Sequence, residues 1–126
     1  MTYTDRLVEL KTALSRLEEA LKEVKNQLDK DGAIQRFEFV FELTWKTLKD
    51  FAEDKGRMEA NSPKGAFRVA ADLGVIGDPQ PWFEFLKSRN DSSHLYNEES
   101  ANRVFSQLPD FVSAMKDLIV SLDKIK

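Results

Sequence analysis

The chemistry that this sequence offers centres on one short polar segment, residues 88–97. It holds the only histidine of the 126-residue chain, His94, and an arginine five positions earlier, Arg89. Imidazole exchanges a proton near neutral pH, and a guanidinium can bind a phosphate through two parallel hydrogen bonds and offset the negative charge that develops on it. The two side chains together suit the cleavage of a phosphate ester.

The spacing of this pair limits how it can act. On a straight α-helix five residues turn about 500°, so the two side chains point about 140° apart. They converge only where the helix ends or bends between them, and the stretch Asp91-Ser92-Ser93 permits this. A polar loop with one arginine and one histidine is more often ordinary solvated surface, and spacing alone favours that interpretation.

Other catalytic chemistries find little support in the sequence. The chain has no cysteine, which excludes disulfides, thiolate metal sites and a cysteine nucleophile. One histidine and dispersed carboxylates do not give the spacing of metal ligands, and the sequence has no Gly-rich phosphate loop. We therefore expect neither a metal site nor a cofactor.

The elements that must position Arg89 and His94 are all predicted to be helices. Hydrophobic residues make up 41% of the chain and charged residues 33%, with five Gly and four Pro, a composition typical of amphipathic helices. Apolar residues that alternate in steps of three and four predict helices over about 5–28, 33–55, 63–73, 82–89 and 98–125. We expect one domain, residues 1–126, folded as an all-α, up-and-down bundle of four to five helices.

Local signals set the predicted boundaries. Residues 29–32 are interpreted as a turn, Ser62 as an N-cap and Gly74 as a C-cap. The eight residues after Arg89 are interpreted as a frayed helix end and a loop, and Pro109 as a kink or a restart of the last helix. The apolar arc of the second helix is broad, which predicts a central place for it in the bundle.

Most other conspicuous side chains have a structural explanation. Core packing is the expected role of the aromatic residues Phe37, Phe41, Trp45, Trp82, Phe83 and Phe85, although an exposed member of the last three could touch a nucleic-acid base or a partner subunit. Arg36 and Glu42 are expected to form surface ion pairs, with positioning of the catalytic loop as the alternative. Scattered basic residues that could add phosphate contacts are Lys64, Arg68 and Arg103.

The overall charge bounds the partners. With 19 Lys and Arg against 22 Asp and Glu, the net charge is −3, so any contact with nucleic acid must use a local patch. The sequence shows neither a signal peptide nor an apolar stretch long enough to span a bilayer. We expect a cytoplasmic protein with no membrane contact.

Two motifs resemble a known family. Arg89, four residues, His94, one residue and Tyr96 are similar to the Arg-x4-His-x-Tyr signature of HEPN-domain proteins of the HepT type, once named nucleotidyltransferase substrate-binding proteins. Asn90 fits as well, because the family favours a polar residue after the arginine. Residues 35–48 resemble the family's second-helix motif, and two motifs in the right order are more specific than either alone.

The resemblance implies an activity and a partner. Proteins of this family form dimers and act as metal-independent endoribonucleases, the toxin half of a toxin–antitoxin pair. A small nucleotidyltransferase of the MNT type silences the toxin by attaching AMP to the motif tyrosine. By this resemblance Arg89 would bind the scissile phosphate, His94 would be the general base or acid, Tyr96 would be modified, and Asn90 and Asp91 would support the pair.

The residue chemistry adds a constraint to this hypothesis. Attack by the RNA 2′-hydroxyl needs one group that takes a proton and another that gives one, yet each chain has a single histidine. A two-fold homodimer would supply two. Two alternatives remain open: a noncatalytic module that docks a nucleotidyltransferase and presents a substrate or its own Tyr96, and a purely structural bundle in which residues 89–96 are buried or disordered.

Overall fold

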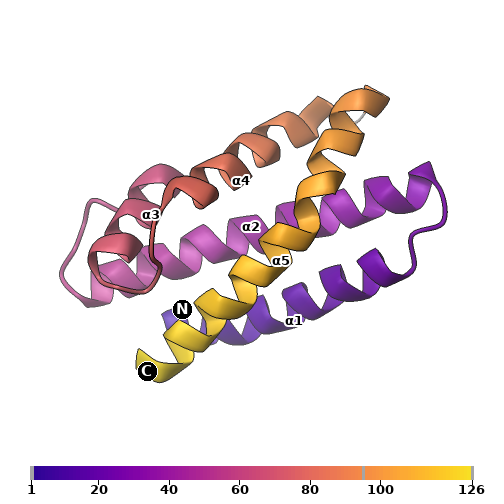
Figure 1. The fold of residues 1–126 in the computed structure, drawn as a ribbon. Coiled ribbons are helices and arrows are strands. Elements are labelled where there is room, and N and C mark those ends of the chain that lie inside the picture. The colour runs from indigo at the N-terminus through magenta and orange to yellow at the C-terminus, as the bar shows by residue number, and fades with distance from the viewer. Residues whose placement is uncertain (1, 95, 126) are drawn as a thin grey trace.

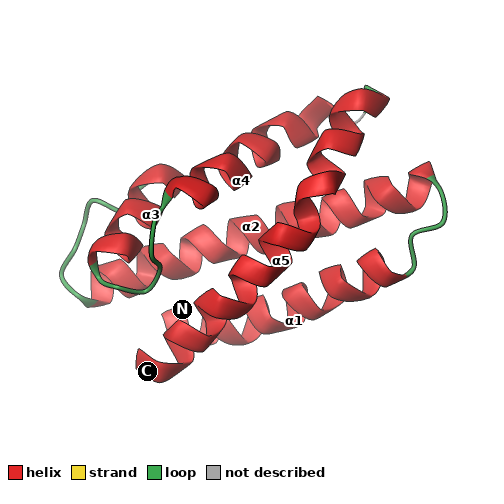
Figure 2. Cartoon of the chain, viewed as in Figure 1, coloured by secondary structure: helices red, strands yellow, loops and turns green. Residues whose placement is uncertain are grey.

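The computed structural model describes residues 2–94 and 96–125, and in this part of the chain every regular element is helical (Figures 1 and 2). The elements are α1 (Tyr3–Lys22), α2 (Gln27–Asp54), α3 (Pro63–Asp72), α4 (Gln80–Asp91), the short 3₁₀ helix η1 (Ser92–His94) and α5 (Glu98–Ile125). The predicted all-α bundle is confirmed.

The long helix α2 lies at the centre of the bundle, as the breadth of its apolar arc predicts. It packs against α1, α3, α4 and α5. Figure 1 shows α1 and α2 running antiparallel, α5 crossing them, and α4 extending beside α2 toward the end of the molecule where α5 begins. The helix that contacts every other α-helix is therefore also the helix against which the end of α4 is placed.

Aromatic rings join the helices in the core. Phe37 of α2 meets Phe111 of α5 edge to face, with ring centroids 4.8 Å apart, and Phe67 of α3 stacks on Trp82 of α4 at 5.1 Å. Burial of one such side chain stabilises the fold by about 1.5–3 kcal/mol. Core packing is confirmed for Phe37, Phe41, Trp82 and Phe85, whereas Trp45 and Phe83 are only partly buried.

The predicted turn at residues 29–32 is wrong. Helix α1 ends at Lys22 and α2 already begins at Gln27. The Asn26 side chain accepts a hydrogen bond from the Asp29 N–H at 2.9 Å, and the Asp29 carboxylate accepts one from the Lys25 N–H at 2.9 Å. Asn26 and Asp29 therefore start a helix instead of ending one, because short polar side chains that favour turns are equally good at an N-cap.

The signals at both ends of α3 are confirmed. The Ser62 hydroxyl accepts a hydrogen bond from the Gly65 N–H at 3.1 Å, with Pro63 in the first turn. After the helix, Gly74 has φ +76°, the left-handed conformation that favours glycine. Gly65 also allows a close approach, since a Cβ there would lie 2.6 Å from the Glu59 carbonyl oxygen. Helix α3 is thereby held against the preceding loop.

The last two helices are more continuous than predicted. Helix α4 begins at Gln80, two residues before Trp82. Pro81 is tolerated in its first turn because the backbone N–H groups there have no partner within the helix, so a residue without an N–H loses no hydrogen bond. It extends to Asp91, so Asn90 and Asp91 are helical and not part of a loop. Helix α5 passes through Pro109 without interruption, which makes the predicted restart wrong.

The two longest helices are amphipathic. Helices α2 and α5 each have 28 residues, or about 42 Å of helix at 1.5 Å per residue. Each buries one side in the core and exposes charged residues on the other. Within residues 2–94 and 96–125, no helix carries an apolar run sufficient to traverse a lipid bilayer.

Candidate functional site

The polar segment singled out from the sequence lies where α4 ends. Arg89 is in the last turn of α4, His94 ends η1, and Tyr96 lies in the turn before α5. The Ser92 hydroxyl donates to the Arg89 carbonyl oxygen at 2.6 Å, which satisfies a helix-end carbonyl and accompanies the change to 3₁₀ geometry. The α-helix thus ends between Arg89 and His94, which meets the condition set by their spacing, but no contact in the described residues joins the two side chains. Leu95 lies outside the described residues.

Arg89 points toward α2, where two carboxylates hold it. Its Nη1 lies 3.3 Å from Glu38 Oε2, and its Nε lies 3.7 Å from Glu42 Oε1. The second distance is too long for a hydrogen bond, and Arg89 Nε is a buried donor without a partner. The guanidinium is therefore oriented by charge on two sides, and its side chain keeps 29% of its surface exposed.

Glu42 is itself fixed by a neighbour. Its Oε2 accepts a hydrogen bond from Trp45 Nε1 at 3.1 Å, while its Oε1 faces Arg89. Of the two roles considered for Glu42, the structure shows an ion pair with Arg89 itself. Glu38 is not among the candidate residues from the sequence. The signal that could have found it is the spacing of Glu38 and Glu42, because residues four apart share one face of a helix.

His94 and Tyr96 contact each other at the surface. Tyr96 Oη lies 3.3 Å from His94 Nδ1, and the two rings meet edge to face with centroids 5.8 Å apart. The direction of the hydrogen bond depends on the imidazole tautomer. Tyr96 is 87% exposed, and His94 Nε2 makes no hydrogen bond to any described residue. Within the described residues one imidazole nitrogen thus contacts the phenol, and the other makes no hydrogen bond.

A further acidic side chain at this end of α4 also faces a cation. Asp91 Oδ2 lies 3.9 Å from Arg103 Nη2 of α5, so the described contact of Asp91 is with α5. Asn90 is exposed, and among the described residues no side-chain hydrogen bond or ion pair joins it or Asp91 to Arg89 or His94. In the same residues no group of three His, Asp or Glu side chains is placed to hold a metal ion.

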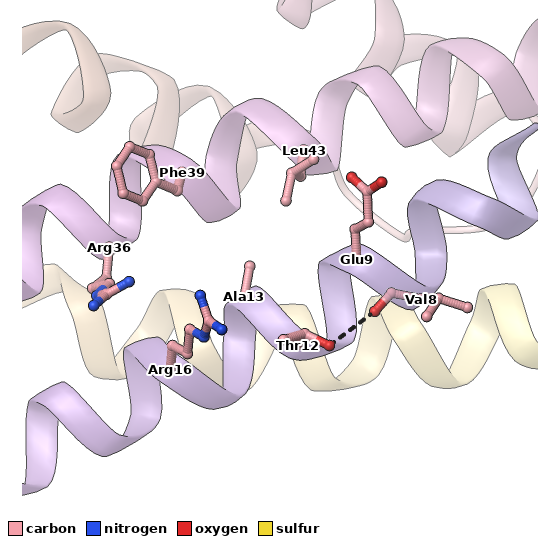
Figure 3. A pocket seen from close by; sticks show the side chains of 8 residues that line it. All are labelled: Val8, Glu9, Thr12, Ala13, Arg16, Arg36, Phe39 and Leu43. Atoms are coloured by element: carbon pink, nitrogen blue, oxygen red, sulfur yellow. Dashed lines mark hydrogen bonds between the residues drawn. The ribbon is translucent and has the colours of Figure 1, made fainter. Parts of the chain in front are cut away.

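A separate hollow lies between α1 and α2 (Figure 3). It has a volume of about 370 Å³ and is lined by Val8, Glu9, Thr12, Ala13, Arg16, Arg36, Phe39 and Leu43. The figure shows the side chains of Arg16 and Arg36 coming from opposite helices near one end, with Phe39 and Leu43 on the α2 side. Arg36 therefore lines this hollow, has no ion-pair partner among the described residues, and contributes nothing to the hold on Arg89.

The chain matches known protein sequences. Residues 5–124 match the model of the family "Nucleotidyltransferase substrate binding protein like". Over 95 residues the chain is 37% identical to "Probable ribonuclease HepT" of Haemophilus influenzae. That match covers 72% of this chain and 65% of the relative, so the chain spans just under two thirds of the relative's length.

Solved structures agree with this assignment. A protein of Thermus thermophilus superimposes with a TM-score of 0.83 at 33% identity, over 90% of this chain and 98% of the other. The Haemophilus influenzae protein HI0074 superimposes with a TM-score of 0.82 at 29% identity, over 93% and 98%. The structure of HI0074 is described as revealing the fold of a substrate binding domain of a nucleotidyltransferase. Together with the match over residues 5–124, these likenesses show that the chain belongs to the nucleotidyltransferase substrate-binding protein-like family.

Proposed function

We propose that this protein is the toxin of a HepT/MNT-type toxin–antitoxin pair, a metal-independent endoribonuclease. The observation that carries the proposal is the arrangement of the three motif residues at the end of α4. Arg89 is oriented by Glu38 and Glu42, and His94 is oriented by Tyr96 with its second nitrogen open. The name of the Haemophilus influenzae relative, "Probable ribonuclease HepT", points to the same activity.

In the proposed reaction a 2′-hydroxyl of the RNA attacks the adjacent phosphate of the same strand. The 2′-oxygen forms a bond to phosphorus while the bond from phosphorus to the 5′-oxygen breaks. A base takes the proton of the 2′-hydroxyl, and an acid gives a proton to the leaving 5′-oxygen. The Arg89 guanidinium would bind the phosphate and offset the charge that grows on its oxygens. His94 Nε2 would be one of the two proton carriers.

The second proton carrier is proposed to come from a second subunit. Each chain has one histidine, and a two-fold dimer that brings the α4 ends together would align two Arg89–His94 pairs along one cleft. The exposure of His94 and Tyr96 is compatible with such a cleft. Asn90 and Asp91, at the end of the same helix, remain proposed supporting residues.

Silencing is proposed to act through Tyr96. The phenol oxygen would attack the α-phosphate of ATP, held by a partner nucleotidyltransferase, and release pyrophosphate. An exposure of 87% leaves Tyr96 accessible to such an enzyme. The attached AMP would break the contact with His94 Nδ1 and place a bulky, negatively charged group beside the site, which would repel RNA.

The test is RNA cleavage in EDTA by purified protein whose Tyr96 is shown to be unmodified by mass spectrometry. We expect His94→Ala and Arg89→Ala to lower the rate by about 100-fold or more, because each removes a proton carrier or a charge stabiliser. Arg16→Ala, an exposed arginine on α1, is the matched control and should leave the rate unchanged. A wild-type protein that leaves a mixed RNA pool intact would contradict the proposal.

A second candidate function is a noncatalytic subunit that docks a nucleotidyltransferase. The family description and the description of HI0074 favour it, and the exposed Tyr96 could then serve as a presented acceptor. The two functions separate on the cleavage assay. If the protein binds its partner and receives AMP at Tyr96 but cuts no RNA before modification, the noncatalytic function is the correct one.

A further inference from the structure

Two exposed cations gather over an aromatic ring on the neighbouring face of the bundle. Lys64 and Arg68 lie one turn apart on α3, and both reach Phe83 of α4. Lys64 Nζ lies 5.4 Å and Arg68 Cζ 5.6 Å from the centroid of the Phe83 ring. These three residues form what we call the Phe83 patch. Since a cation over an aromatic face is attracted by the ring, the patch holds two positive charges close together.

The two cations of the Phe83 patch are not tied up in ion pairs with the described residues. Neither Lys64 nor Arg68 has an ion-pair partner among residues 2–94 and 96–125. The one acidic residue of α3, Asp72, instead accepts a hydrogen bond from Arg57 Nη2 at 3.0 Å. Glu59 accepts a second hydrogen bond, from Arg57 Nε at 2.8 Å. The hydrogen bonds to Asp72 and Glu59 raise the pKa of Arg57. The carboxylates closest in sequence to Lys64 and Arg68 are thus held by Arg57 and form no ion pair with either cation.

The patch lies on the same face of α4 as Asn90, one of the candidate supporting residues. Phe83 and Asn90 are seven residues apart, which is close to two full turns, so both lie on one face of the helix. The rise between them is about 10 Å, and Asn90 directly follows Arg89. Arg89 itself is six residues, or about 600°, from Phe83 and so points about 120° away from it. A strand bound at Arg89 could therefore reach Lys64 and Arg68 by passing around α4 over Asn90.

We propose that the Phe83 patch binds the phosphate backbone of single-stranded RNA beside the scissile bond. The inference rests on the proposed ribonuclease function and deepens it, because it makes the substrate a strand of several nucleotides and not an isolated dinucleotide. A chain of net charge −3 does not attract RNA as a whole, so it needs a local group of uncompensated cations for this purpose. Phe83 positions the two cations, and Lys64 and Arg68 bind the phosphates.

The experiment measures binding separately from cleavage. A fluorescently labelled 12-nucleotide single-stranded RNA is titrated with the His94→Ala protein at several salt concentrations. We expect the further change Lys64→Gln/Arg68→Gln to raise the Kd at least about tenfold at low salt. It should also reduce the slope of log K against log salt by about 1.4, or about 0.7 for each phosphate that is no longer neutralised. The control Arg16→Gln/Lys124→Gln removes two exposed positive charges elsewhere, neither of them in an ion pair with a described residue, and should change the Kd less than about twofold.

A cleavage assay on the otherwise wild-type protein completes the test. Lys64→Gln/Arg68→Gln should slow cutting of the 12-nucleotide RNA and leave a dinucleotide substrate unaffected. If the Lys64→Gln/Arg68→Gln change leaves the salt slope unchanged, the proposed role of the patch is wrong, and the ribonuclease proposal is unaffected. Conversely, RNA binding that depends on the patch in a protein that never cuts RNA overturns the ribonuclease function alone. Absence of RNA binding by the His94→Ala protein overturns the patch.

Discussion

The cation Arg89 and the two cations of the Phe83 patch lie on adjoining helices but have different surroundings. The guanidinium of Arg89 lies between Glu38 and Glu42, so its direction is set and its charge is locally offset. Lys64 and Arg68 rest on an aromatic ring and form no ion pair with a carboxylate of the described residues. An offset charge contributes little long-range attraction but can be placed accurately, whereas an uncompensated charge attracts without fixing geometry. The first suits a reaction centre and the second suits capture of a substrate.

The comparison predicts a division of kinetic effects. Under the proposed function, changes at Arg89 and at the carboxylates that hold it should lower kcat, because they would alter interactions made at the reacting phosphate. Changes in the Phe83 patch should raise KM and leave kcat nearly constant, because they remove binding energy that is equal in the ground state and the transition state. A single set of cleavage curves can therefore confirm or break the comparison.

The largest effect is expected for Arg89→Lys. Lysine keeps the positive charge but has no planar fork, so it cannot face Glu38 and Glu42 and still present paired N–H groups to a phosphate. We expect kcat to fall about 100-fold at saturating RNA, measured under single-turnover conditions. Arg68→Lys is the matched control and should keep at least half of the wild-type rate. If Arg89→Lys does the same, Arg89 acts as a simple charge and the distinction between the two groups disappears.

A smaller effect is expected for the carboxylates. Glu38→Gln and Glu42→Gln remove the charge that orients Arg89, and glutamine at position 42 retains an oxygen that can accept the Trp45 Nε1 hydrogen bond. We expect kcat to fall about tenfold for each variant, since small displacements of a catalytic group are costly, with no rise in KM. Glu9→Gln on α1 is the control. Faster cutting by either α2 variant would mean that the carboxylates restrain Arg89 instead of positioning it.

These carboxylate variants should remain folded. The side chains of Glu38, Glu42 and Arg89 are 25%, 40% and 29% exposed, and ion pairs so open to solvent contribute at most about 1 kcal/mol. A thermal unfolding curve within a few degrees of the wild type is the expected result. It would assign any loss of activity to the orientation of Arg89 and not to unfolding.

The sequence could predict the helices but not the hold on Arg89. Apolar periodicity depends on local geometry, so the stripes that contain Phe37, Phe41 and Phe111 were predictable, and so were the caps at Ser62 and Gly74. The hold on Arg89 joins residues about fifty positions apart, and nothing in a single helix says that α4 ends beside the middle of α2.

Boundaries failed where one residue type serves two purposes. Asp29 has the short polar side chain that is typical of turns, but its carboxylate and backbone N–H both take part in the start of α2. Which of the two roles such a residue takes depends on how the preceding helix ends, and the apolar stripe of the first helix continues past Lys22 without a clear stop. The sequence therefore showed that a helix boundary was near, but not whether Asp29 ends one helix or begins the next.

The candidate site divides in the same way. Arg89, His94 and Tyr96 could be chosen because their spacing resembles a family motif, and the contact between His94 Nδ1 and Tyr96 Oη spans only two residues. The sequence named Lys64 and Arg68, with Arg103, as scattered cations that could contact phosphate, but it could not assemble the Phe83 patch. Only the packing of α3 against α4 places both over one ring.

The smallest effect is expected for Phe83→Leu, which tests how the patch holds its cations. Leucine preserves apolar packing between α3 and α4 but removes the aromatic face under Lys64 and Arg68. A cation–π contact at an exposed site is worth about 0.5–1 kcal/mol, so the KM for a 12-nucleotide RNA should rise about threefold while kcat stays constant. Phe83→Trp retains an aromatic face and should restore the wild-type KM, a rescue that a purely structural role for Phe83 does not predict. If both variants raise KM equally, the ring serves only as packing, and the two cations act without a fixed platform.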